Sequence, residues 1–265
     1  MQFESLPLTE VTAYSERVLL SDGAETTVHI ARYPIDTYTI EVVDTTIDSQ
    51  PRTLLDYSRS TGHMELINGG YFLDGLPMGE VWHAGAPIPH RAFPEQVAGE
   101  RGTLYVDSLG KIIFDRRGNL PAIPDGDLLS AGPLLVHNGA SLIKGKNDPE
   151  GFLKTADDHD EYIDEQRNPR AGIGQTACEI VGLVVDGRSP EDAGMLLYEF
   201  AEFARSLGMV SMLNLDGGGT STMISRGRMR NVSRNNDTVL NPEGRRTHTG
   251  LAIVPRGNIR SYIKM

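Results

Sequence analysis

The stretch Asn214-Leu215-Asp216-Gly217-Gly218-Gly219-Thr220-Ser221-Thr222-Met223 closes an apolar run, Val210 to Leu215, with an acid and three glycines. This pattern is typical of a buried strand that ends at a binding site, because glycines adopt positive φ and let the backbone approach a ligand. Successive N–H groups in such a turn also form a concavity that attracts anions. A tight structural turn is the alternative. We predict a site built from Asp216, Gly217, Gly218, Gly219, Thr220 and Ser221.

The residues before this stretch predict a strand, a helix and a second strand. Glu179 to Asp186 is an apolar strand, and Ser189-Pro190 carries the N-cap and first-turn signals of a helix that Gly208 ends. If the two strands share a sheet, the connection is a right-handed crossover and the strands are neighbours. We therefore expect an α/β (mixed α+β) fold, with a mixed β-sheet and flanking helices in a single compact domain over residues 1–265.

Further elements are expected on both sides of this unit. Residues 26–43 read as two strands around a turn at Pro34, and 103–114 as a hairpin. Ser49-Gln50-Pro51 opens a short helix that Gly62 closes. The segment 145–169 is an acidic insertion, which we interpret as a solvated loop, with a weak cation site or a mobile flap as the alternative.

Composition limits the classes of function. The chain has 265 residues and a net charge of −11, which argues against a broad face for nucleic acid. Its single cysteine, Cys178, excludes an intramolecular disulfide. No apolar run reaches the ~18 residues of a membrane span, and the first residues do not form a signal peptide. The expected location is cytoplasmic as written, or secreted if the chain was trimmed.

Carboxylates and amides at strand ends are the candidate catalytic groups. Asp186 and Asp216 each follow an apolar strand, and Asn68 follows the strand Met64 to Ile67. Glu80 follows a glycine-rich segment and is a candidate for binding the substrate. Glycosidic cleavage commonly uses two carboxyl groups, so we expect Asp186 and Asp216 to form a pair. The histidines lack HxH or HExxH spacing. No cofactor is therefore required, and a divalent cation stays open.

Arginines are the candidate anion-binding groups. Arg170 precedes a glycine-spaced strand, and six arginines fall between residues 226 and 246. Arginine recognises phosphate and carboxylate in a bidentate manner. We expect Arg245 or Arg246 to point inward, because neighbouring residues of a strand face opposite sides.

Six motifs in order give the chain a family resemblance. They are Asn68-Gly69-Gly70-Tyr71-Phe72, Gly132-Pro133-Leu134-Leu135-Val136, Arg170-Ala171-Gly172-Ile173-Gly174, Val185-Asp186-Gly187-Arg188, Asn214-Leu215-Asp216-Gly217-Gly218-Gly219, and the tail from Asn231 to Arg246. Together they resemble the phosphodiester glycosidase family over residues 65–255. The family usually has Ser where Thr220 stands, so the hydroxyl is kept.

The resemblance implies a hydrolase that removes a sugar, in the best-known case N-acetylglucosamine, from a phosphodiester at its anomeric carbon. It implies that Asn68, Arg170, Asp186, Asp216 and the loop 217–221 line the site. A sugar phosphodiester or a surface polysaccharide is the expected substrate.

Two other functions stay open. One is a non-catalytic carbohydrate-binding module on the same scaffold, which would keep its ligand after Asp216→Asn. The other is a metal-dependent phosphodiesterase that cleaves the P–O bond. The absence of metal-binding histidine spacings argues against it.

Overall fold

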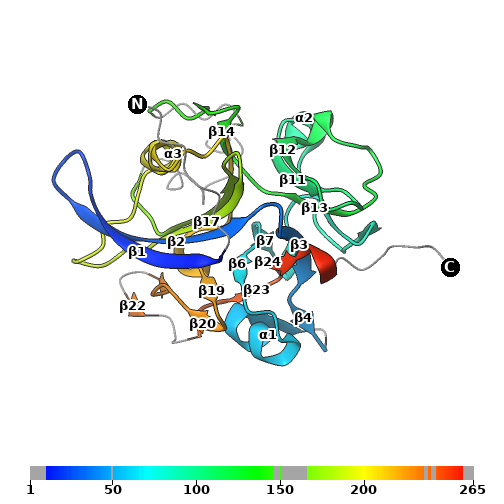
Figure 1. Cartoon of the computed structure of the whole chain (residues 1–265), viewed down its shortest axis with the longest axis horizontal. Helices are drawn as coiled ribbons and strands as arrows, with labels where there is room; N and C mark the ends of the chain where they lie inside the picture. The colour runs from blue at the N-terminus through cyan, green and yellow to red at the C-terminus, as the bar shows by residue number, and fades with distance from the viewer. Residues whose placement is uncertain are drawn as a thin grey trace.

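The computed structural model describes residues 10–48, 50–145, 150, 166–235, 238–239 and 243–258. Within them the chain forms three larger antiparallel sheets and three smaller ones (Figure 1). Every pairing between named strands is antiparallel. The α/β expectation is therefore wrong: the described chain is β-rich, and its helices are α1 (Leu54–Thr61), α2 (Glu95–Ala98) and α3 (Leu197–Ser206).

The first sheet has seven strands in the order β1-β2-β17-β16-β18-β14-β15. The predicted neighbours β17 and β18 lie in this one sheet, but β16 lies between them and pairs antiparallel with both. The expected adjacency is therefore wrong. The strands are β1 (Thr12–Leu19), β2 (Glu25–Pro34), β14 (Leu134–His137), β15 (Ala140–Ser141), β16 (Arg170–Gln175), β17 (Glu179–Val185) and β18 (Ser211–Asn214).

Two five-stranded sheets complete the larger layers. One has the order β20-β19-β6-β24-β3, and the other β10-β9-β13-β11-β12. The expected pair of strands around Pro34 is present, but β2 and β3 belong to different sheets. The strands are β3 (Tyr38–Asp44), β6 (Leu66–Asn68), β19 (Met223–Ser225), β20 (Arg228–Met229) and β24 (Thr249–Pro255), and then β9 (Val81–His83), β10 (Ala86–Pro87), β11 (Gly102–Val106), β12 (Ile112–Arg116) and β13 (Asp127–Ser130).

Short strands and 3-10 turns connect these layers. The small sheets are β23-β5-β4, β21-β22 and β7-β8. Their strands are β4 (Thr46–Ile47), β5 (Gln50–Thr53), β7 (Phe72–Leu73), β8 (Leu76–Pro77), β21 (Arg234–Asn235), β22 (Thr238–Val239) and β23 (Arg246–Thr247), and the turns are η1 (Arg117–Asn119), η3 (Gly218–Thr220) and η4 (Arg256–Asn258).

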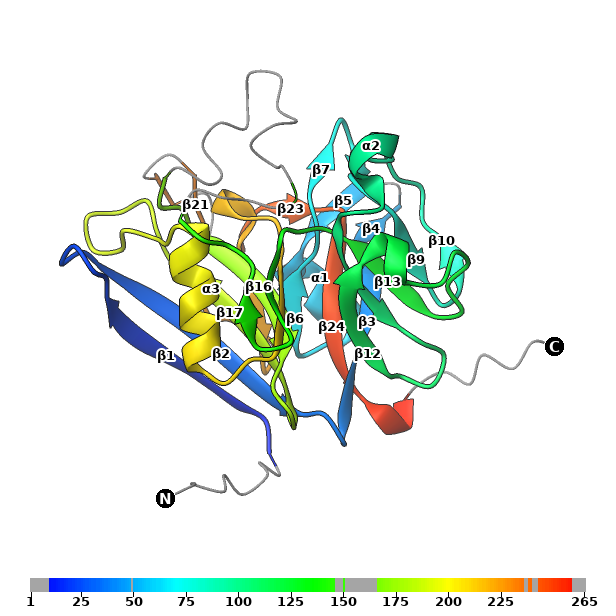
Figure 2. The ribbon, with the colours of Figure 1, turned by 90° about the horizontal axis from the view of Figure 1, so that it is seen from above.

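Alternation along β2 separates two hydrophobic cores. Val28 and Ile30 face the core under α3, which holds Phe200, whereas Ala31 and Tyr33 face the core between the sheets. This is the period of two expected of a strand with both faces covered. Figures 1 and 2 show α3 on the outer face of the seven-stranded sheet, and Figure 1 shows α1 on the far side of the molecule.

Both predicted helix starts are displaced. Residues 50–53 form β5, and α1 begins after Thr53, whose hydroxyl accepts from Asp56 N at 3.1 Å; Gly62 ends the helix as expected. The Ser189-Pro190 signal serves a turn instead of a helix. Asp192 accepts from Thr27 N at 2.8 Å and binds Arg17, so the acid expected in a first helical turn holds this turn to the sheet.

Candidate active site

A single buried amide holds the glycine loop that follows β18. Asn68, at the end of β6, is fully buried, and its Nδ2 donates to the carbonyl of Asp216 at 2.8 Å. Its Oδ1 accepts from the N–H of Thr222 at 3.0 Å. The backbone of Asp216 also donates to the carbonyl of Gly69 at 3.1 Å. The structure thus brings Asn68 and Asp216 together, with Asn68 acting on the backbone and the carboxylate of Asp216 half-buried beside the loop.

The hydroxyls of this loop are buried without hydrogen-bond partners. Among the described residues, Thr220 Oγ1, Ser221 Oγ and Thr222 Oγ1 have none, and neither does Thr249 Oγ1 on the neighbouring strand. A buried polar atom without a partner costs about 1–3 kcal/mol, so native proteins usually satisfy it with water or a ligand. These four oxygens are enclosed by protein atoms around the glycine loop.

Gly218 allows an arginine to lie directly over the loop. Its φ is +59°, and a Cβ there would meet Arg188 Nη1 at 3.1 Å. The Nε and Nη2 of Arg188 donate to Asn168 Oδ1 at 3.1 and 2.9 Å. A planar cation therefore lies against the glycines, where it can recognise phosphate.

The backbone of the loop offers fewer donors than the three glycines suggest. The N–H groups of Gly218, Thr220 and Ser221 donate to carbonyls of the protein itself. These three N–H groups are therefore not available to an anion at the loop.

Asp186 lies behind the loop and is already bonded at both oxygens. Its Oδ2 is 2.8 Å from His29 Nε2, and its Oδ1 accepts from Val232 N at 3.0 Å. The next residue, Ser233, donates to the carbonyl of Gly219. Asp186 therefore reaches the glycine loop through the segment 232–233, and its side chain is only 6% exposed.

Arg170 holds the backbone around the site. It is 3% exposed, and its Nε donates to the carbonyl of Met195 at 2.9 Å and its Nη2 to that of Gln166 at 3.1 Å. The residue before it, Pro169, accepts from Gly218 N. These contacts place Arg170 at the start of β16, next to Pro169, whose carbonyl binds the glycine loop.

The two candidate arginines of the tail differ in their surroundings. The guanidinium carbon of Arg245 lies 5.3 Å from the centre of the Phe72 ring, and the adjacent Gly244 lies against Thr222 of the loop. Arg246 belongs to β23 and is paired with Thr53. Both side chains are exposed. Arg245 is the one anchored beside the motif Asn68 to Phe72.

Glu80 is engaged in a structural ion pair. Its Oε1 accepts from Arg117 Nη2 at 2.9 Å and from Trp82 Nε1 at 2.7 Å. Desolvation raises the pKa of Glu80, but the hydrogen bonds from Arg117 and Trp82 outweigh it, so the pKa lies below its ordinary value. These contacts favour a role in joining β9 to η1.

A known protein family matches most of the chain. The model of the phosphodiester glycosidase family matches residues 62–254. The chain belongs to the phosphodiester glycosidase family. The matched range closely follows the one that carries the motifs, and it includes Asn68, Asp186 and the glycine loop.

Solved structures share the fold. The catalytic domain of zebrafish N-acetylglucosamine-1-phosphodiester α-N-acetylglucosaminidase, auto-inhibited by its pro-peptide, superposes with a TM-score of 0.70 at 19% identity, covering 95% of this chain and 85% of that one. A hypothetical protein from Synechocystis gives 0.62 at 18% identity, covering 92% and 62%. A search of curated protein sequences finds no match.

Three residues of the candidate site were not predicted from the sequence. Arg188 ends the motif Val185-Asp186-Gly187-Arg188, but the neighbouring sequence does not indicate that its side chain reaches Gly218. His29 carries no motif and meets Asp186 across 157 positions. Asn214 donates to Tyr71 Oη and the carbonyl of Gly132, and its buried Oδ1 has no partner among the described residues. The position of Asn214 near the end of the apolar run is the sequence feature that could have identified it.

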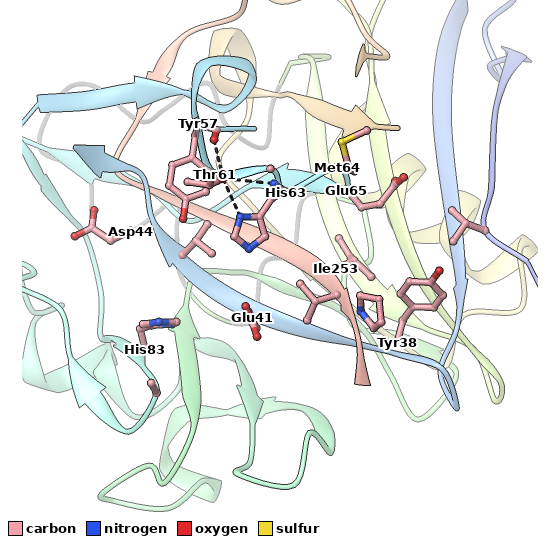
Figure 3. Close-up of a pocket in the computed structure, with 16 residues that line it drawn as sticks. Tyr38, Glu41, Asp44, Tyr57, Thr61, His63, Met64, Glu65, His83 and Ile253 are labelled. Atoms are coloured by element: carbon pink, nitrogen blue, oxygen red, sulfur yellow. Dashed lines mark hydrogen bonds between the residues drawn. The ribbon is translucent and has the colours of Figure 1, made fainter. Parts of the chain in front are cut away.

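A groove of about 710 Å³ lies away from the glycine loop. Figure 3 shows it lined by Glu41, Asp44, His63 and His83. The described residues that line it include none of the glycine loop 217–221 and neither Asn68 nor Asp186. The groove is therefore lined by other residues than the candidate site.

Metal and membrane features are absent from the described part of the chain. Its residues contain no group of three or more His, Cys, Asp or Glu side chains placed to hold a metal ion. None of its helices is long and apolar enough to cross a membrane. Most of the acidic insertion 145–169, including all its acidic residues from Asp157 to Glu165, lies outside the described residues.

Proposed function

We propose that this chain hydrolyses the bond between the anomeric carbon of a sugar and a phosphodiester oxygen. The observation that supports this best is the position of Arg188 over Gly218, in the loop that Asp216 begins and within the residues that the family model matches. A sugar phosphodiester carries an anion, and Arg188 supplies a planar cation that can bind it. N-acetylglucosamine is the proposed sugar, on the basis of the zebrafish relative's name.

Asp216 is the proposed catalytic carboxylate. It begins the glycine loop, is half-buried, and has its backbone fixed by Asn68 and Gly69. A phosphodiester is a good leaving group, so the reaction needs less help from a general acid than the cleavage of an ordinary glycoside. One carboxylate that stabilises the developing positive charge at the anomeric carbon, or attacks it, suffices.

The other predicted residues take supporting roles in this proposal. Asn68 positions the loop, and Asp186 positions the segment 232–233, because both of its oxygens are bonded within the protein. Arg188 and Arg245 bind the phosphate, one over Gly218 and one over Phe72. Arg170 holds the backbone on which the loop rests.

The test is hydrolysis of N-acetylglucosamine 1-phosphate methyl ester in ¹⁸O-labelled water. Label in the sugar hydroxyl supports cleavage at the anomeric carbon, and label in the phosphate means cleavage of P–O instead. Asp216→Asn should retain binding and lose turnover. Binding without turnover in the unchanged chain, over a panel of sugar phosphodiesters, would favour the carbohydrate-binding module.

A further inference from the structure

Ser15, on strand β1, begins a hydrogen-bonded chain that ends at Asp186. Ser15 Oγ lies 2.8 Å from His29 Nδ1, and His29 Nε2 lies 2.8 Å from Asp186 Oδ2. The side chains of His29 and Asp186 are 7% and 6% exposed, whereas Ser15 is exposed. A hydroxyl, an imidazole and a carboxylate in this order form the arrangement that activates a serine nucleophile.

The hydrogen bonds fix the tautomer that a general base needs. An ionised carboxylate only accepts hydrogen bonds, so Asp186 accepts from both Val232 N–H and His29 Nε2–H. In a neutral imidazole the other nitrogen is then an acceptor. Nδ1 of His29 therefore faces the hydroxyl proton of Ser15, which it can remove.

The backbone of Ser15 supplies a donor on the open side of the sheet. β1 is the edge strand of its sheet. The carbonyl of Ala13 in β1 accepts from Arg230 at 3.5 Å, and that of Val11, just before β1, accepts from Arg226 at 3.3 Å. In an antiparallel edge strand, alternate residues present their backbone polar groups to this outer edge. By the same alternation the N–H of Ser15 points outward. The nucleophile's own N–H is a recurrent donor to the oxyanion of acyl transfer.

We propose that Ser15, His29 and Asp186 form a second hydrolytic site, which cleaves short carboxylic O-acyl esters. Ser15 Oγ attacks the carbonyl carbon while His29 takes its proton, and the alcohol then leaves with that proton as the ester C–O bond breaks. Water, deprotonated by His29, cleaves the acyl-serine, and the proton returns to Ser15. The site uses neither Asp216 nor the glycine loop and shares only Asp186 with the proposed glycosidase site, so Ser15→Ala tests it separately.

Covalent labelling tests the nucleophile directly. The purified chain is incubated with an alkyl fluorophosphonate and examined by intact mass and peptide mapping. We expect one adduct per chain, on Ser15, and none in Ser15→Ala. Ser108→Ala is the matched control, because Ser108 Oγ is bonded to a carboxylate, Asp125, at 2.7 Å without an imidazole between them. Ser108→Ala should label like the unchanged chain.

Turnover of p-nitrophenyl acetate provides the second measurement. The rate should fall at least tenfold in Ser15→Ala and in His29→Gln, with Ser108→Ala unchanged. Thermal melting checks the fold, because Ser15→Ala removes a surface hydroxyl together with its hydrogen bond to His29. An unlabelled Ser15, or ester hydrolysis that is equal in Ser15→Ala and the unchanged chain, would overturn the proposal.

Discussion

The side-chain amide of Asn68 bonds the carbonyl of Asp216 at 2.8 Å and the N–H of Thr222 at 3.0 Å, so one side chain spans the whole glycine loop. The two segments are 148 positions apart in the sequence. Because Asn68 is fully buried, bulk solvent does not compete for these bonds. The catalytic carboxylate proposed here is therefore placed by a residue from another sheet.

Replacing Asn68 tests this clamp. Asn68→Ala leaves a buried carbonyl and a buried N–H without partners, which should lower the free energy of unfolding by about 2–3 kcal/mol. Urea denaturation measures the change. Asn119→Ala is the control, since Asn119 makes an exposed bond to Asp115 and its loss should cost little. Equal losses of unfolding free energy in the two variants would contradict a stabilising role of the Asn68 hydrogen bonds.

Gly218 tests the contact between the loop and Arg188. Gly218→Ala combines a positive φ with a Cβ only 3.1 Å from Arg188 Nη1. We expect a loss of about 1–2 kcal/mol of stability from the positive φ alone, together with a raised KM for phosphodiester substrates because Arg188 must move. Gly23→Ala is the matched control, since Gly23 has φ +88° and open space around it. Gly23→Ala should show the stability loss without the change in KM.

The sequence located the glycine loop and Asn68 but not the architecture around them. The strand-helix-strand pattern of residues 179–215 predicted neighbouring strands. The structure inserts β16 between them, because its glycines allow close packing: a Cβ at Gly174 would lie 2.0 Å from the carbonyl of Ser211. Which strand fills a gap depends on such contacts across the sheet. The local hydrophobic periodicity of the sequence carries no information about these contacts between strands.

The roles of the candidate site residues could also be predicted only in part from the sequence. A carboxylate at a strand end identifies Asp186 and Asp216 equally. His29 and Val232 contact both oxygens of Asp186, and the sequence around Asp186 indicates neither partner. Glu80 likewise looked available in the sequence, and Arg117, from another segment, pairs with it.

The ion pair of Glu80 predicts a pH dependence of stability. The pKa of Glu80 is lowered, so its contribution is present above the ordinary glutamate value and is lost as the pH falls through the folded-state value. The melting temperature of Glu80→Gln should lie below that of the unchanged chain at pH 6, and the gap should narrow towards pH 3. Turnover at pH 6 should be nearly unchanged. A loss of activity without a loss of stability would instead return Glu80 to the site.

The pair of arginines at 245 and 246 separates phosphate recognition from structural support. Arg245 lies over Phe72, next to the loop contact of Gly244, whereas Arg246 lies on β23. Charge-assisted hydrogen bonds contribute on the order of 1.5–3 kcal/mol, so Arg245→Ala should weaken phosphodiester substrates by roughly tenfold or more. Arg246→Ala, with the same loss of charge, should change KM little. Neutral aryl glycosides should be affected by neither variant, because they carry no phosphate. If Arg245→Ala weakens charged and neutral substrates alike, the arginine supports the fold through Phe72, and the phosphate is held elsewhere.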